Sequence, residues 1–256
     1  MRRSLLYISL LIFAVPMAAS AQIRGAWSAL VKGDRVHLNM TRANSNWGRT
    51  LPRTDFAISE DAITSATETP VHFALNRDAG TIDFTGTSQS GEGVGRFSFT
   101  PNHSYVATLQ SLGVSTASRI DDEDLFSLAM HDVSIAFIRD MQSLGYRENL
   151  DQYVAFRIHG VTGESSRAIK ELGVKDLSAG QLVAMRIHGV STEYVRELRD
   201  LGYTALSSDD LVSMRIHGVS TRFIRELATA GYHNIPVGKL VEMKIHGIDA
   251  SMLRLK

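Results

Sequence analysis

Apolar residues follow two different periods along this chain of 256 residues. Up to about residue 101 they alternate with polar residues, as in RVHLNM and VHFALNR, which predicts half-buried β-strands. Beyond that point they recur every three or four residues, which predicts amphipathic helices. The pattern therefore predicts an α+β protein, with a small antiparallel β-domain at residues 22–101 and a helical array at residues 102–256.

Turn signals divide the β-domain into its predicted strands. The alternating apolar positions are Trp27, Ala29 and Val31; Val36, Leu38 and Met40; Val71, Phe73 and Leu75; Ile82 and Phe84; Phe97 and Phe99. Asp78-Ala79-Gly80 predicts one tight turn, and the glycines at 86, 91, 93 and 95 predict a looser connection. Residues 44–70 lack alternation and are expected to be less regular. The pattern leaves open whether the strands form one sheet or a sandwich.

A short motif recurs at a fixed step in the helical region. It reads FRIHGV, MRIHGV, MRIHGV and MKIHGI, and a degenerate copy ending in MHDV precedes them. The histidines lie at 131, 159, 188, 217 and 246, so the steps are 28, 29, 29 and 29 residues. Such a period is typical of stacked repeats that bury their apolar faces against their neighbours. We therefore predict an α-solenoid of helix pairs with a repeat of about 29 residues.

One repeat shows why two helices form in each. Ser178 is an N-cap residue and Gln181 completes a capping box, so a helix begins there. Gly189 supplies the left-handed residue that commonly ends a helix. Ser191 starts a second helix, and Gly202 ends it. Each repeat is therefore expected to hold two short helices that depend on packing for stability.

The N-terminal residues predict export. Arg2 and Arg3 precede an apolar segment at residues 5–15, and Ala19-Ser20-Ala21 offers a cleavage site, which together are typical of a secretory signal peptide at residues 1–21. We expect a periplasmic or extracellular protein without a stable membrane span after cleavage, and a retained anchor is the alternative. The chain has no cysteine, so neither disulfides nor a lipidated cysteine contribute.

Composition argues against several functions. The 27 basic and 27 acidic residues balance, whereas a dedicated nucleic-acid-binding protein is strongly basic. No Gly-x-Ser-x-Gly elbow, phosphate-binding glycine loop or His-Glu-x-x-His pair occurs. We predict a protein that is not an enzyme and uses no cofactor. The acidic run Asp121-Asp122-Glu123-Asp124 resembles a calcium cluster, but its place at a helix start favours capping.

The repeated His-Gly pairs allow a structural and a metal-binding interpretation. We predict that they are structural repeat positions that close each first helix, where a histidine suits the helix dipole. These residues are His159, Gly160, His188, Gly189, His217, Gly218, His246 and Gly247. A histidine ladder that binds a metal or senses pH is the alternative. Equivalent positions in neighbouring helices lie about 9–10 Å apart, which is too far to share one ion, so we predict no metal site.

Cationic residues also repeat in register. One set lies in the second helices, at Arg139, Arg167, Arg196, Arg225 and Arg254, and another lies two residues before each histidine, at Arg157, Arg186, Arg215 and Lys244. We predict that Arg139, Arg167, Arg196 and Arg225 bind an acidic partner. Acidic residues such as Glu197, Asp200 and Glu226 lie nearby, so ion pairs between repeats are the alternative use of the same charges.

The sequence also resembles a known module. The segment RDAGTIDFTGTSQSGEGVGRFSFTPN, followed by repeats of LVxMRIHGVS, is similar to a secreted module of bacterial proteins. The same module occurs at the extracytoplasmic C-terminal end of some membrane metallopeptidases of the β-lactam-sensor and antirepressor type. The resemblance implies an envelope protein that binds a protein partner in a regulatory or sensory role. The alternative function is a ligand-binding or hydrolytic β-domain for which the helices are a scaffold.

Overall fold

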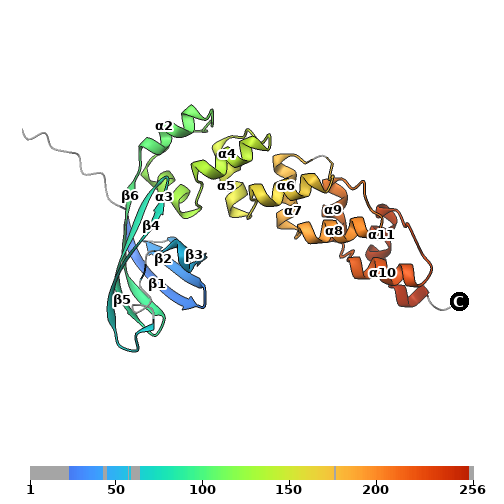
Figure 1. Ribbon diagram of the computed structural model, residues 1–256, viewed down its shortest axis with the longest axis horizontal. Helices are drawn as coiled ribbons and strands as arrows, with labels where there is room; N and C mark the ends of the chain where they lie inside the picture. Colours follow the sequence, from blue (N-terminus) through green and yellow to red (C-terminus); the bar gives the residue numbers. More distant parts are fainter. Residues whose placement is uncertain (1–22, 43–44, 57, 59–63, 176, 254–256) are drawn as a thin grey trace, which may run out of the picture.

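The computed structural model describes residues 23–42, 45–56, 58, 64–175 and 177–253. In these ranges a six-stranded antiparallel sheet is followed by ten α-helices, which confirms the predicted α+β class and the order of its parts. Figure 1 shows the sheet at one end of the molecule and the helices leading away from it in a row. The predicted signal peptide and Arg254 lie outside the described residues.

The strands form a single sheet, in the order β3-β2-β1-β6-β5-β4. Their bounds are β1 Arg24–Lys32, β2 Arg35–Arg42, β3 Ser45–Pro52, β4 Thr69–Arg77, β5 Gly80–Gln89 and β6 Glu92–Pro101. Every neighbouring pair is antiparallel. Among the apolar residues that defined the predicted strands, all are buried except Ala29 and Val31, which are partly buried. The tight turn predicted at Asp78-Ala79-Gly80 joins β4 to β5.

The prediction of an irregular stretch at residues 44–70 is wrong for its first part. Strand β3 pairs with β2 over its whole length, with Trp47 opposite Met40 and Leu51 opposite Val36. Its sequence, SNWGRTLP, carries Gly and Pro and little alternation. Such a segment is tolerated because β3 is an edge strand and bonds to only one neighbour.

The glycines of the predicted loose connection mostly lie inside strands. Only Gly91 is in the β5–β6 turn, where it and Ser90 have positive φ. The Trp27 indole occupies the space over β6: its Nε1 donates to the Thr85 carbonyl at 3.1 Å, and a Cβ on Gly93 would lie 2.9 Å from its ring. The missing side chains thus let the indole cross β6.

The sheet is strongly curled around an aromatic core. Trp27 on β1 and Phe73 on β4 are three strands apart in the sheet, yet their ring centroids are 5.2 Å apart. A flat sheet would separate these strands by about 14 Å. Phe84 stacks on Phe73 at 4.8 Å, and Phe56 packs edge-on against both rings. Aromatic side chains of the sheet, together with Phe56 from the segment after β3, therefore fill this part of its inner face.

The ten described α-helices are short. Eight of them begin after a residue whose side chain caps the helix, and the first and the last begin without a side-chain cap. They are α2 Ser104–Ser111, α3 Asp122–Met130, α4 Ile135–Ser143, α5 Leu150–Ile158, α6 Gly163–Glu171, α7 Ala179–Ile187, α8 Thr192–Asp200, α9 Ser208–Ile216, α10 Thr221–Thr229 and α11 Val237–Ile245. The capping boxes of Ser178 with Gln181 and of Asp121 with Asp124 are both present, so the acidic run caps a helix. After α11 the chain forms a 3-10 turn, η2 Ala250–Leu253.

Helices two apart in sequence lie side by side from α4 onward. The odd row is α5, α7, α9 and α11, and the even row is α4, α6, α8 and α10. We call each odd-numbered helix from α3 onward, together with the helix that follows it, a unit; the last unit is α11 with η2. Tyrosines connect the units, because the Tyr146 hydroxyl donates to the Leu177 carbonyl at 3.0 Å and the Tyr203 hydroxyl to the Ile235 carbonyl at 2.8 Å.

The sheet and the first units share one apolar core. Phe126 on α3 is 2% exposed and contacts three aromatic rings of the sheet, with centroid distances of 5.5 Å to Trp47, 5.8 Å to Phe97 and 5.3 Å to Phe99. The same buried cluster continues to Leu182 on α7. A second cluster fills the later units. The apolar core thus continues from the sheet into the helices beyond residue 101.

Candidate functional site

The four repeated histidines each follow the last residue of an odd-row helix. Their backbone N–H groups donate to the carbonyl four residues earlier, and the glycines after them have φ of 70°, 70°, 72° and 67°. These are His159, His188, His217 and His246, followed by Gly160, Gly189, Gly218 and Gly247. All four imidazoles are exposed, and within the described residues none forms a side-chain hydrogen bond. The described residues also contain no group of three or more metal-ligating side chains.

A row of exposed isoleucines accompanies the histidines. Ile158, Ile187, Ile216 and Ile245 are 51%, 55%, 54% and 58% exposed, although each ends a helix that buries apolar side chains on its other side. The helical phase of Ile187 turns it away from the core: Leu182 and Met185 are buried, and Ile187 follows Met185 by two residues, about 200° around the helix. Large apolar side chains at an equivalent exposed position in four units form a candidate contact surface.

The cations two residues before the histidines reach back to the preceding unit. Arg157 donates to the His131 carbonyl at 3.1 Å and to the Asp132 carboxylate at 2.6 Å. Arg186 lies over Gly160, so that a Cβ atom added to Gly160 would be 3.1 Å from Nη2 of Arg186. Nε of Arg186 donates to the His159 carbonyl at 3.4 Å.

The last two cations of this set pack on aromatic rings. Arg215 lies 5.0 Å from the Tyr194 ring centroid, and Lys244 lies 4.7 Å from that of Phe223. Burial raises the pKa of the Tyr194 phenol to about 12, against the opposite effect of Arg215. The hydroxyl therefore stays protonated and donates to the Val219 carbonyl at 2.6 Å. This set of cations thus has a clear packing role between units.

The predicted partner-binding arginines lie on the even row, and all four are exposed. Arg167 binds Asp140 of the preceding unit at 2.8 Å, and Arg225 likewise binds Glu197 at 3.2 Å. Arg196 pairs with Glu193 of its own helix, and within the described residues Arg139 has no acidic partner. The even row thus brings these arginines into register together with carboxylates. Their partner-binding role stays a prediction.

The degenerate first motif joins the helices to the sheet. Asp132 stands where later units have glycine and keeps φ at 52°. Its carboxylate forms an ion pair with Arg157, with Nη2 at 2.6 Å from Oδ2. It also lies 3.4 Å from Nε of Arg77 on β4. Arg49 on β3 donates to Nδ1 of the His131 ring at 2.8 Å. Burial, followed by the charges of Arg49 and Arg157, lowers the pKa of His131.

Because His131 is part of this junction, we predict that the free energy of unfolding falls in acid. Because folding lowers the pKa of His131, the unfolded chain binds more protons as the pH falls below about 6.5, so the contribution of His131 is present above that pH and lost below it. His131→Gln keeps an acceptor for Arg49 but does not titrate. Urea unfolding at pH 7.5 and pH 5.0 should show a larger loss for the native chain than for His131→Gln. Equal losses would contradict the assignment.

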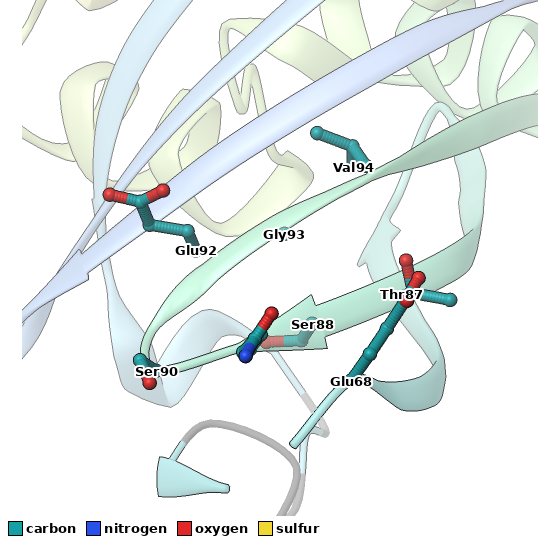
Figure 2. A pocket seen from close by; sticks show the side chains of 8 residues that line it. Glu68, Thr87, Ser88, Ser90, Glu92, Gly93 and Val94 are labelled. Carbon is teal, nitrogen blue, oxygen red and sulfur yellow. The ribbon is translucent and has the colours of Figure 1, made fainter. Parts of the chain in front are cut away.

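The sheet carries a separate polar hollow. It has a volume of about 560 Å³ and is lined by the β5–β6 hairpin, including Ser88, Gln89 and Val94, together with Glu68. The carboxylates of Glu68 and Glu92 point in different directions (Figure 2). A smaller apolar cavity of about 30 Å³ lies beneath Trp27 and Phe73. The hollow is large enough for a small ligand, but its carboxylates do not converge on one point.

Comparisons with protein-family models, curated proteins and solved structures found no match. None of the helices in the described ranges is long and apolar enough to cross a bilayer.

Proposed function

We propose that this protein is an exported module of the bacterial envelope that binds a protein partner along an α-solenoid formed by its helix pairs. The observation that carries the proposal is the row of exposed isoleucines, which repeats with the units on adjacent helices of the odd row. Stacked repeats present equivalent side chains as an extended surface, which suits an extended or helical partner better than a small molecule. The resemblance of the IHGV repeats to an extracytoplasmic module supports the same role.

Photo-crosslinking in the envelope tests this proposal on the full chain. A photoreactive phenylalanine derivative is placed at one of three exposed sites: Ile187 on the odd row, Arg196 on the even row, or Val94 beside the hollow of the sheet. We expect crosslinks to a discrete protein from Ile187 or Arg196 and not from Val94. Crosslinks from Val94 alone, or none from the helices, would favour the competing ligand-binding β-domain.

A further inference from the structure

We infer that the C-terminal ends of the odd-row helices bind an extended acidic segment of a protein partner. We call this surface the isoleucine edge, formed by Ile158, Ile187, Ile216 and Ile245 with the guanidinium groups of Arg186 and Arg215. Apolar side chains of the segment pack on the isoleucines, and its carboxylates bind the two arginines. The inference rests on the proposed function and names the surface and the chemistry of the partner.

Comparison of the units separates the isoleucines from other exposed positions. Seven residues before each isoleucine the chain has Asp, Gly, Asp and Gly, and three residues before it has Ala, Ala, Ser and Glu. Of these three positions, only the isoleucine is identical in all four units, and its side chain remains more than half exposed. An isoleucine at a helix end that contacts only water does not stabilise the fold, because the free energy of burying its side chain is not realised.

The first unit shows this position covered. Met130 on α3 stands where the later units have isoleucine, and it is only 5% exposed. Helix α3 contacts β5 and β6, and the adjacent His131 ring accepts a hydrogen bond from Arg49 on β3. In the first unit the sheet therefore covers the C-terminal end of the odd helix. In the later units the same end faces solvent.

The acidic character of the partner follows from a difference between Asp132 and the glycines. Arg157 of the second unit binds the Asp132 carboxylate of the first unit at 2.6 Å. The equivalent Arg186 and Arg215 lie over Gly160 and Gly189. A Cβ atom added to Gly160 would be 3.1 Å from Nη2 of Arg186, and one added to Gly189 would be 3.2 Å from Nη2 of Arg215. Neither forms an ion pair with any described residue. A carboxylate from a partner takes the place of Asp132 at these two guanidinium groups.

The spacing of the units favours an extended segment. Axes of packed helices lie about 8–10 Å apart. Three residues of a polyproline II segment span about 9 Å and complete one turn, so every third side chain lies on the same side and meets an equivalent position of the next unit. Four isoleucines therefore match apolar residues at every third position, with acidic residues between them.

A fluorescent peptide of the sequence Leu-Glu-Pro-Leu-Glu-Pro-Leu-Glu-Pro-Leu tests the inference on the full mature chain by fluorescence anisotropy. We expect saturable binding that weakens at least tenfold in Ile187→Ser/Ile216→Ser. The peptide with Lys in place of Glu should bind at least tenfold less tightly to the native chain. Arg186→Gln/Arg215→Gln should weaken binding and flatten its salt dependence. Arg186→Lys/Arg215→Lys, which keeps the charges, should retain most of that salt dependence.

The matched control is Arg167→Gln/Arg196→Gln/Arg225→Gln on the even row, which should bind the peptide as the native chain does. The isoleucines are exposed, so the serine variant should keep its helical circular dichroism and melting temperature. Failure of the peptide to bind, equal binding by the serine variant, or equal binding of the Lys peptide overturns the inference. So does an isoleucine-dependent interaction with phosphatidylglycerol vesicles or a second copy of the chain in place of the peptide. Crosslinks from Arg196 would still support the proposed function in each case.

Discussion

Replacing Phe126 with alanine is expected to lower the free energy of unfolding by about 3–5 kcal/mol, the range for removing a buried aromatic ring. The ring is 2% exposed and fills the junction between α3 and the sheet, in contact with Trp47, Phe97 and Phe99. Its loss leaves a cavity lined by three rigid aromatic side chains, which cannot easily move in to fill it.

Urea unfolding followed by circular dichroism measures this loss, and the melting temperature should fall by roughly 6–20 °C. Tyr232→Ala is the matched control, because Tyr232 is 45% exposed and its truncation should change stability by less than about 0.5 kcal/mol. A change below about 1 kcal/mol in Phe126→Ala would show that the helices do not depend on this contact with the sheet.

Gly95→Ala is expected to destabilise the protein by about 3 kcal/mol, at the upper end of the range for overpacking. A Cβ on Gly95 would lie 2.0 Å from the Thr85 carbonyl oxygen and 2.7 Å from Nε1 of Trp27. The first atom belongs to the backbone of β5 and cannot rotate away. The second donates to that same carbonyl, so the substitution also disturbs the hydrogen bond of the indole.

The matched control for this change is Gly180→Ala. Gly180 lies in α7, with no atom within 4 Å of a built Cβ, so alanine there should stabilise the helix by up to about 1 kcal/mol. Thermal unfolding with tryptophan fluorescence reports both variants, since Trp27 and Trp47 lie in the sheet. A stability of Gly95→Ala within about 0.5 kcal/mol of the native chain would mean that β5 and β6 separate at little cost.

The candidate site was only partly visible in the sequence. Its repeat positions were evident, because the His-Gly pairs return at a constant step. The exposure of Ile187 was also available in principle from its angle to Met185 around the helix axis. The partners of the arginines were not, because Arg167 and Asp140 are 27 residues apart and meet only when adjacent units stack.

The sequence by itself determined the class of the protein, the limits of most helices and the inward faces of most strands. These properties depend on signals within a few residues, such as the capping box at Ser178 and the alternation through Phe73. Tertiary structure alone decided that SNWGRTLP becomes β3, because that strand exists through its pairing with β2. It also decided that the Trp27 ring packs against the β6 glycines, and that Arg157 pairs with the Asp132 carboxylate whereas Arg186 lies over Gly160, which has no side chain. Contacts between distant residues select among local conformations that the sequence alone allows.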